Sequence, residues 1–327
     1  MLLRPLGATG LEVTPVGLGL AALGRPAYID LGRHADLGDD RGVDDLERRS
    51  HQVLDTAWAA GVRYLDAARS YGRAEAFLAS WLTTRGIDPA EVTVGSKWGY
   101  TYVGDWRMDA STHEVKDHSL AALTRQAAES RALLGDHLDL YQVHSATLDS
   151  GVLEDRAVLE ELSRLRDQGI VIGLSTSGPA QADTIRRALE VTGAGVAPFA
   201  CVQATWNLLE RSAGPALAEA SAAGWGVIVK EAVANGRLSP HGGGPAVAAL
   251  GRVADRHGVG VDAVALAAVL ANPWADVVLS GAVAAGQLQA NLAALQVELD
   301  PVELEQLAGL AEPAEAYWRA RSALAWS

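Results

Sequence analysis

Eight short apolar segments, each followed by a stretch with helical periodicity, constrain the fold of this chain more than any other feature. These segments are apolar on both faces, which is typical of the strands of a parallel sheet that helices cover on both sides. Eight strand–helix units predict an α/β protein with a closed (β/α)8 barrel, the TIM barrel fold. The predicted strands are residues 15–23, 62–67, 92–98, 138–145, 170–177, 200–209, 226–233 and 275–283.

The segment before the first predicted strand has a different pattern. LRPLGATGLEV alternates around Gly7 and Gly10, which predicts a β-hairpin that closes the bottom of the barrel. A doubly wound open sheet is the main structural alternative, but GLGLAALG at 17–24 lacks the G-x-G-x-x-G spacing of its first turn. No repeat and no proline-rich linker divides the sequence. We therefore predict a single domain over residues 1–327.

Three segments, residues 24–44, 99–117 and 312–327, are longer than ordinary connections. Loops of this length in a compact domain are usually functional or disordered. Aromatic residues in and beside the second segment argue against disorder there. We interpret two of them, Trp98 and Trp106, as candidate substrate-binding residues, and we expect long loops on the active face of the barrel.

Composition excludes several classes of function. A net charge of −13 argues against a nucleic-acid partner, because phosphates require a basic face. The one cysteine, Cys201, allows no internal disulfide, and its apolar surroundings PFACVQA predict a buried, inert thiol. MLLRPLG lacks the apolar core of a signal peptide, and no uncharged run could span a membrane. We expect a cytoplasmic protein with no membrane partner; its oligomeric state is open.

Four chemically active residues follow or end three consecutive predicted strands: Asp66 and Tyr71, then Lys97, then His144. The carboxyl ends of barrel strands converge, so these side chains are expected to meet. Asp66 would pair with Lys97, and the ammonium would lower the pKa of Tyr71 so that it can transfer a proton. His144 would stay neutral and donate an N–H to a substrate oxygen. Each residue alone has a structural explanation, but together they favour a carbonyl or alcohol proton-transfer site.

The chain also resembles the aldo-keto reductase superfamily over essentially its whole length. The resemblance is carried by RPLGATGLEVTPVGLG, AAGVRYLDAARSYG, GSKWG and DLYQVHS, in order and in spacing. It implies an NAD(P)-dependent (β/α)8-barrel oxidoreductase in which hydride passes between nicotinamide and a carbonyl carbon without a metal. It also implies that Asp66, Tyr71, Lys97 and His144 form the catalytic tetrad, with Tyr71 as general acid/base.

The resemblance further implies which residues hold the nicotinamide. Family members use a Ser-Asn pair after the fifth strand and a Gln on the sixth, and the matching residues are Ser175, Thr176 and Gln203. Threonine has a shorter reach than the asparagine it replaces. After the seventh strand, Lys230 stands where an aromatic residue usually stacks on the nicotinamide; a simple pairing of Lys230 with Glu231 is an equal alternative.

The segment LSGAVAAGQLQAN resembles the adenosine-phosphate motif of the family. The matching residues are Gly281, Ala282, Gln287 and Asn291. Val283 is a further candidate cofactor-binding residue, but no cation for a 2′-phosphate lies between Gly281 and Asn291. This departure favours NAD or dual use of NAD(P)H, although Arg237 or Lys230 could supply a distant cation. The choice between NAD and NADP is therefore open.

We predict an enzyme that interconverts aldehydes or ketones and alcohols with NAD(P)H. One alternative is an NAD-linked sugar (aldose) dehydrogenase that works mainly in the oxidative direction, with a sugar-like substrate. Another is a cofactor-binding, redox-sensing regulatory subunit. A metal-dependent barrel hydrolase would need more ligands than His113 and His118, so no metal site is predicted.

Overall fold

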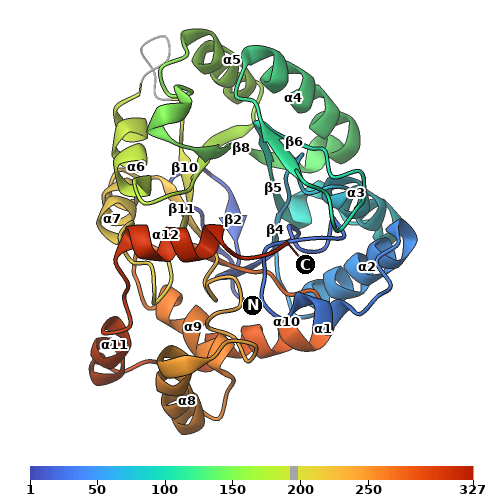
Figure 1. Cartoon of the computed structure of the whole chain (residues 1–327). Coiled ribbons are helices and arrows are strands. Elements are labelled where there is room, and N and C mark those ends of the chain that lie inside the picture. Colours follow the sequence, from blue (N-terminus) through green and yellow to red (C-terminus); the bar gives the residue numbers. More distant parts are fainter. Residues whose placement is uncertain (192–197, 327) are drawn as a thin grey trace.

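A closed barrel of eight parallel strands forms the centre of the computed structural model, which describes residues 1–191 and 198–326. Figure 1 shows this ring of strands surrounded by helices. The strand order around the ring is β10-β11-β12-β3-β4-β5-β8-β9, so the predicted (β/α)8 fold is confirmed. The barrel strands are β3 (Val16–Gly19), β4 (Tyr64–Asp66), β5 (Thr93–Trp98), β8 (Leu138–Ala146), β9 (Val171–Thr176), β10 (Cys201–Thr205), β11 (Gly226–Lys230) and β12 (Val277–Ser280).

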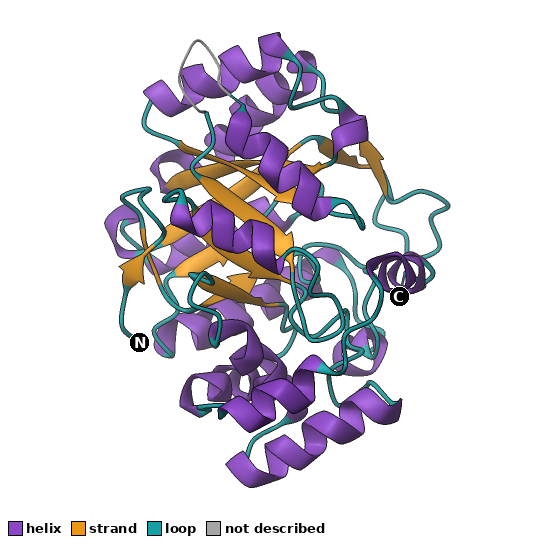
Figure 2. Ribbon diagram, turned by 90° about the vertical axis from the view of Figure 1, so that its left-hand side faces the viewer, coloured by secondary structure: helices purple, strands orange, loops and turns teal. Residues whose placement is uncertain are grey.

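Helices follow the strands and cover the outside of the barrel (Figure 2). They are α1 (Arg33–Leu37), α2 (Val43–Ala59), α3 (Ala74–Arg85), α4 (Leu120–Leu134), α5 (Arg156–Asp167), α6 (Gln181–Glu190), α7 (Gly214–Ala222), α8 (Gly244–His257), α9 (Val261–Leu270), α10 (Ala285–Leu292), α11 (Pro301–Ala308) and α12 (Ala314–Ser322). Short 3-10 turns are η1 (Pro89–Glu91), η2 (Gly135–His137), η3 (Leu148–Ser150) and η4 (Ala293–Gln296). Within the described residues, no helix is both long enough and apolar enough to cross a membrane.

The predicted hairpin at the start of the chain is present. β1 (Arg4–Pro5) pairs antiparallel with β2 (Glu12–Val13). Its side chains Leu6 and Val13 are fully buried and pack with Tyr64 and Cys201, the first residues of β4 and β10. The hairpin therefore closes the amino ends of the strands, and Cys201 is buried as expected. Burial raises the pKa of its thiol well above the ordinary value.

Several strands end earlier than the sequence pattern predicts. β3 stops at Gly19 because the chain turns, with the amides of Leu23 and Gly24 donating to the carbonyl of Leu20. β10 stops at Thr205 because the side chain of Asn207 accepts hydrogen bonds from the next backbone amides. The apolar run continues in both places, but local hydrogen bonds end the ladder.

The three long segments contain secondary structure that the pattern did not indicate. Residues 99–117 include a hairpin of β6 (Tyr100–Tyr102) and β7 (Glu114–Lys116), and residues 24–44 include α1. Residues 312–327 include α12, whose Tyr317 and Trp318 are buried. Figure 1 shows α12, in red, crossing the face of the barrel, and Figure 2 shows the two termini at opposite ends of the molecule.

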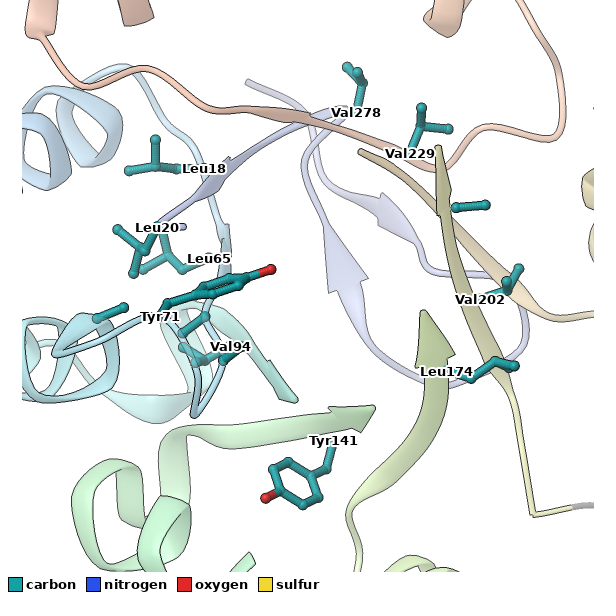
Figure 3. Close-up of a cluster of buried hydrophobic side chains, with 14 of the residues drawn as sticks. Leu18, Leu20, Leu65, Tyr71, Val94, Tyr141, Leu174, Val202, Val229 and Val278 are labelled. Carbon is teal, nitrogen blue, oxygen red and sulfur yellow. The ribbon is translucent and has the colours of Figure 1, made fainter. Parts of the chain in front are cut away.

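Alternation along the strands decides which residues reach the barrel interior. Figure 3 shows Val202, Val229 and Val278 pointing away from the barrel axis, toward the helices. Because side chains alternate along a strand, Gln203 and Lys230 face the interior. The same pattern places polar groups at the carboxyl ends of the strands inside an otherwise apolar barrel.

We expect Gly7→Ala to destabilise the fold more than Gly10→Ala. A Cβ at Gly7 would lie 2.4 Å from the backbone of Trp225 and Gly226, whereas a Cβ at Gly10 would meet nothing within 4 Å. Both residues have positive φ, 51° and 82°, so alanine causes backbone strain at either position. Only the alanine at position 7 would also clash with neighbouring atoms. Urea unfolding should show an extra loss of about 1–3 kcal/mol for Gly7→Ala. Equal losses would show that the hairpin does not pack tightly against the barrel.

Candidate active site

The carboxyl ends of the strands surround a cavity of about 450 Å³. Asp66, Tyr71, His144, Gln203 and Lys230 all line it, and they come from β4, the loop after β4, β8, β10 and β11. The structure thus brings together residues that are up to 164 positions apart in the sequence, from Asp66 to Lys230 (230 − 66).

A buried ion pair lies at the base of this cavity. Asp66 ends β4, Lys97 lies on the neighbouring β5, and the two side chains form a salt bridge with exposures of only 2% and 0%. Asp66 also accepts hydrogen bonds from Gln203 Nε2 at 2.8 Å and from the Tyr64 hydroxyl at 3.3 Å. Lys97 Nζ donates to the carbonyl of Ala67 at 3.0 Å. Burial lowers the pKa of Lys97, and the Asp66 carboxylate opposes that shift. Two buried charges of this kind are tolerated only when each has close partners.

Two glycines fix the loop that carries Tyr71. A Cβ at Gly72, where φ is +60°, would lie 2.4 Å from the carbonyl oxygen of Gly24, and a Cβ at Gly24 would lie 2.2 Å from that of Tyr71. The amide of Arg73 donates to Gly24 at 2.7 Å, which ties the two segments together. This close approach of backbones is possible only without side chains. Tyr71 is consequently held in one position, and Figure 3 shows its hydroxyl pointing toward the middle of the barrel.

Lys97 and Arg25 both lie near the Tyr71 ring, with Nζ 5.0 Å and the guanidinium carbon 5.2 Å from its centre. The sequence-based expectation that the phenol has a lowered pKa is wrong for this environment. Burial raises the pKa of Tyr71 well above its ordinary value, Asp66 adds to the rise, and Arg25 opposes it. The physical reason is that the ring is only 9% exposed, so desolvation of the phenolate outweighs the nearby cations. Tyr71 therefore keeps its proton at neutral pH and can act as an acid.

His144, near the end of β8, packs edge-on against Tyr71 with ring centres 5.4 Å apart. Its Nδ1 lies 3.3 Å from the Ser70 hydroxyl. Burial lowers the pKa of His144 well below the ordinary value, and the cations Lys97 and Lys230 lower it further. His144 is therefore neutral, as expected. A neutral imidazole and a protonated phenol side by side form a pair of hydrogen-bond donors for one oxygen atom.

Two of the three residues expected to hold a carboxamide are bonded within the protein. Gln203 donates to Asp66, and the Ser175 hydroxyl accepts from the amide of Ser145 at 2.8 Å. The hydroxyl of Thr176 is buried without a hydrogen-bond partner. Thr176 lies at the carboxyl end of β9 but does not itself line the cavity.

Lys230 is part of a larger ionic network. Its Nζ donates to the Thr205 hydroxyl at 2.8 Å and lies 3.8 Å from Glu231, which Arg321 of α12 also binds. Burial lowers the pKa of Lys230 to about 8, and Glu231 opposes that shift. The pairing of Lys230 with Glu231 that the sequence left open is present, although Lys230 also lines the cavity.

The residues of the LSGAV segment lie around the start of α10. Gly281 lines the cavity, whereas the side chains of Ala282 and Val283 are buried. Gln287 accepts from the amide of Val283 at 2.9 Å, and Asn291 donates to Ser280 at 2.8 Å.

The two distant cations considered for a 2′-phosphate are both engaged. Arg237 is paired with Glu312, and Lys230 with Thr205 and Glu231. Both side chains already have acidic partners, so neither is an unpaired cation for a phosphate at the start of α10.

The N-terminus of α10 lies just after Gly281, which lines the cavity. No side chain caps this helix; Ser119, Asp155 and Asp300 cap α4, α5 and α11, but the other described α-helices also lack a side-chain cap. A phosphate at uncapped helix amides is favourable, and the loops after the last two barrel strands commonly bind one. Together with the open space at Gly281, which lines the cavity, this region has room for a phosphate group.

Neither tryptophan proposed as a substrate-binding residue lines the cavity. Trp98 is fully buried and meets His118 edge-on at 5.6 Å. Trp106 packs against Phe77, and its indole donates to the carbonyl of Arg41 at 2.8 Å. The expectation is corrected because the side chain of Trp98 points out of the barrel and Trp106 folds against the 24–44 segment.

The sequence reasoning missed several residues that do line the cavity. Arg25 forms a salt bridge with Glu114 at 2.6 Å, and its guanidinium lies 4.9 Å from the centre of the Trp326 ring. Arg321 and Trp326 come from the C-terminal segment. The one indication in the sequence was that Arg25 lies in the long segment 24–44, and Arg321 and Trp326 in the long segment 312–327.

The two histidines weighed as metal ligands have other contacts. His113 stacks on Trp326 with ring centres 4.1 Å apart, and His118 Nε2 hydrogen-bonds the carbonyl of His144 at 2.9 Å. Within residues 1–191 and 198–326, no group of three His, Cys, Asp or Glu residues is arranged to hold a metal ion.

We predict that Asp66→Asn and Lys97→Met each destabilise the protein by about 3–5 kcal/mol, because each leaves a buried charge unpaired. The double variant should lose much less than the sum, since both charges are then removed. Chemical unfolding of the four proteins at pH 7 gives the coupling energy. Strictly additive losses would contradict the buried pair.

Arg321→Gln should lower stability in a pH-dependent way. Burial alone would raise the pKa of Glu231, but Arg321 and Lys230 hold it at about 2, below the ordinary value of 4.5. The ion pair therefore stabilises the fold above about pH 4.5, and its contribution is lost as the pH falls toward 2. The stability difference from wild type should be full at pH 7 and smaller at about pH 3. Arg319→Gln, on the exposed side of α12, should show no such trend.

Comparisons with known proteins agree with this geometry. The chain is 28% identical to the uncharacterized oxidoreductase YqkF of Bacillus subtilis, over 54% of this chain and about half (49%) of that protein. It is 25% identical to AAD14 of Saccharomyces cerevisiae, which bears the name of an aryl-alcohol dehydrogenase, over 93% of this chain and 85% of that one.

Structural comparison extends the likeness to the whole barrel. The holo form of an aldo-keto reductase from Bacillus halodurans superposes with a TM-score of 0.72 at 22% identity, covering 96% of this chain and 97% of that one, which shows a shared fold. The family model described as "Aldo/keto reductase family" matches residues 37–312. This chain therefore belongs to the aldo/keto reductase family.

Proposed function

We propose that this protein is an NAD(P)-dependent oxidoreductase that interconverts small aldehydes or ketones and the corresponding alcohols, with Tyr71 as the general acid/base. The observation that carries the proposal is the arrangement of Tyr71 between His144 and Lys97, with Lys97 bonded to Asp66 beneath it. Membership of the family supports an oxidoreductase of this type.

In the direction of reduction, the protonated phenol of Tyr71 donates its proton to the carbonyl oxygen of the substrate. The Ser70 hydroxyl lies 3.3 Å from His144 Nδ1. A bond donated by this hydroxyl would leave the His144 proton on Nε2, where it would hydrogen-bond the same oxygen. The Lys97 ammonium stabilises the phenolate that remains, and Asp66 keeps that ammonium in place. When bound, NAD(P)H supplies the hydride for the carbonyl carbon.

The residues that would hold the dinucleotide extend from Thr176 and Lys230 to Gly281 and the N-terminus of α10. The uncapped amides of α10 would bind phosphate oxygens. Thr176 has an unpaired hydroxyl but does not line the cavity, so its contact with the dinucleotide rests on the family resemblance alone. Lys230 is a cation at the position where an aromatic residue was expected. Its contacts with Thr205 and Glu231 support a polar rather than a stacking contact with the ligand.

A second candidate is NAD-linked oxidation of a sugar-like alcohol. The cavity wall supports it, because Arg25, Glu114, Glu231 and Arg321 offer many hydrogen-bonding groups to a polyhydroxylated substrate. An assay panel of aliphatic and aromatic aldehydes with NAD(P)H, and of aldoses with NAD⁺, separates the two candidates by their relative kcat/KM. Tight dinucleotide binding without turnover on any panel member would instead favour a regulatory subunit.

We expect Tyr71→Phe to lower kcat by about 10²–10⁴-fold while the dinucleotide Kd changes little, because only the proton-transfer group is removed. Tyr102→Phe is the matched control: it also loses one hydroxyl, but its hydroxyl accepts from the amide of Trp106, outside the cavity. Its kcat should stay within about threefold of wild type. Retention of more than a tenth of the activity by Tyr71→Phe would remove Tyr71 from the mechanism.

A further inference from the structure

An acidic side chain of the 24–44 segment reaches the helix that follows the last barrel strand. Asp36, in α1, accepts a hydrogen bond of 2.5 Å from Gln287 Nε2, in the first turn of α10. The amide oxygen of Gln287 accepts from the backbone of Val283 at 2.9 Å, so the Gln287 side chain is fixed at both ends. Asp36 thus places a carboxylate directly beside the start of α10.

Within residues 1–191 and 198–326, no arginine or lysine side chain forms a hydrogen bond or salt bridge with the Asp36 carboxylate. His241, from the loop after β11, lies 3.1 Å from the carboxylate. The nearby Arg49 donates instead to the backbone carbonyls of Asp36 and Leu37, at 3.3 and 3.2 Å. A second acid, Asp30, lies close enough for the charge of Asp36 to raise its pKa. The side chain of Asp36 is 20% exposed, so a ligand can reach it.

The next step rests on the proposed function. A dinucleotide with its pyrophosphate at the uncapped amides of α10 would have its adenosine end near Val283 and Gln287. Because Gln287 is bonded to Asp36, the adenosine ribose would then approach the Asp36 carboxylate. A carboxylate accepts hydrogen bonds from ribose hydroxyls, but it repels a 2′-phosphate at close range.

We propose that Asp36 is a specificity-determining residue that selects NAD(H) over NADP(H), by accepting from the adenosine ribose and repelling a 2′-phosphate. The buried side chain of Val283 and the pairing of Arg237 with Glu312 act in the same direction, because neither offers a cation to a phosphate. The preference for NAD(H) therefore has two sources. One is the negative charge of Asp36, from the 24–44 segment, and the other is the lack of a cation in the segment Gly281–Asn291.

Titration of tryptophan fluorescence with NADH and with NADPH tests this assignment. Wild type should bind NADH at least as tightly as NADPH. Asp36→Asn keeps an oxygen that can accept from Gln287 but removes the charge, so it should tighten NADPH binding by roughly tenfold, while the Kd for NADH changes less than about threefold. Titration at about pH 8 keeps histidine side chains largely neutral.

Asp40→Asn is the matched control. Asp40 is an exposed acid on the same segment, with no contact to Gln287, so its neutralisation removes the same net charge at a greater distance. It should leave the ratio of the two Kd values within about twofold of wild type. An equal change in both variants would mean that only the overall charge matters, which would overturn the assignment of Asp36.

The remaining outcomes separate the inference from the proposed function. Binding of both nucleotides with an unchanged ratio in Asp36→Asn would overturn the role of Asp36 and leave the oxidoreductase proposal standing. A hundredfold preference of wild type for NADPH would do the same. Failure of both nucleotides to bind wild type would overturn the proposed function and the inference together.

Discussion

The buried ion pair between Asp66 and Lys97 is the interaction on which the rest of the site depends. Two charges without water are stable only when each has close partners, and β4 and β5 hold them side by side. Asp66 uses its second oxygen to accept from Gln203, whose strand β10 lies four places from β4 in the ring of eight. This bond crosses the barrel, so the pair that positions a cation near Tyr71 also joins opposite walls of the fold.

The cavity above this pair is built mainly by contacts between segments far apart in the chain. Arg25 pairs with Glu114, and Arg321 pairs with Glu231, so the cations of the wall are each matched by an acid. The wall therefore offers many hydrogen bonds with little net charge. Arg321 belongs to α12, and its salt bridge with Glu231 joins the C-terminal segment to the end of β11. The C-terminal segment therefore forms part of the cavity wall.

The departures from the expected pattern gather along the proposed dinucleotide groove. Thr176 has an unpaired hydroxyl, Lys230 is held by Thr205 and Glu231, and the segment Gly281–Asn291 carries no cation. The residues proposed for proton transfer keep the types that the family resemblance implies, whereas Thr176 and Lys230, proposed for the cofactor, depart from them. In a barrel this separation is natural, because strand ends and loops can change independently.

The sequence alone determined the barrel and the meeting of Asp66, Lys97 and His144. Apolar strands alternating with helices permit few topologies, and the carboxyl ends of neighbouring parallel strands converge whatever the loops do. Only the tertiary structure decided the rest. Trp98 and Trp106 are turned away from the cavity, Arg25 and Trp326 are brought to it, and burial raises the pKa of Tyr71 despite the cation beside it. Loop contacts and desolvation depend on segments that lie from about 20 to about 300 residues apart in the chain, and no local pattern encodes them.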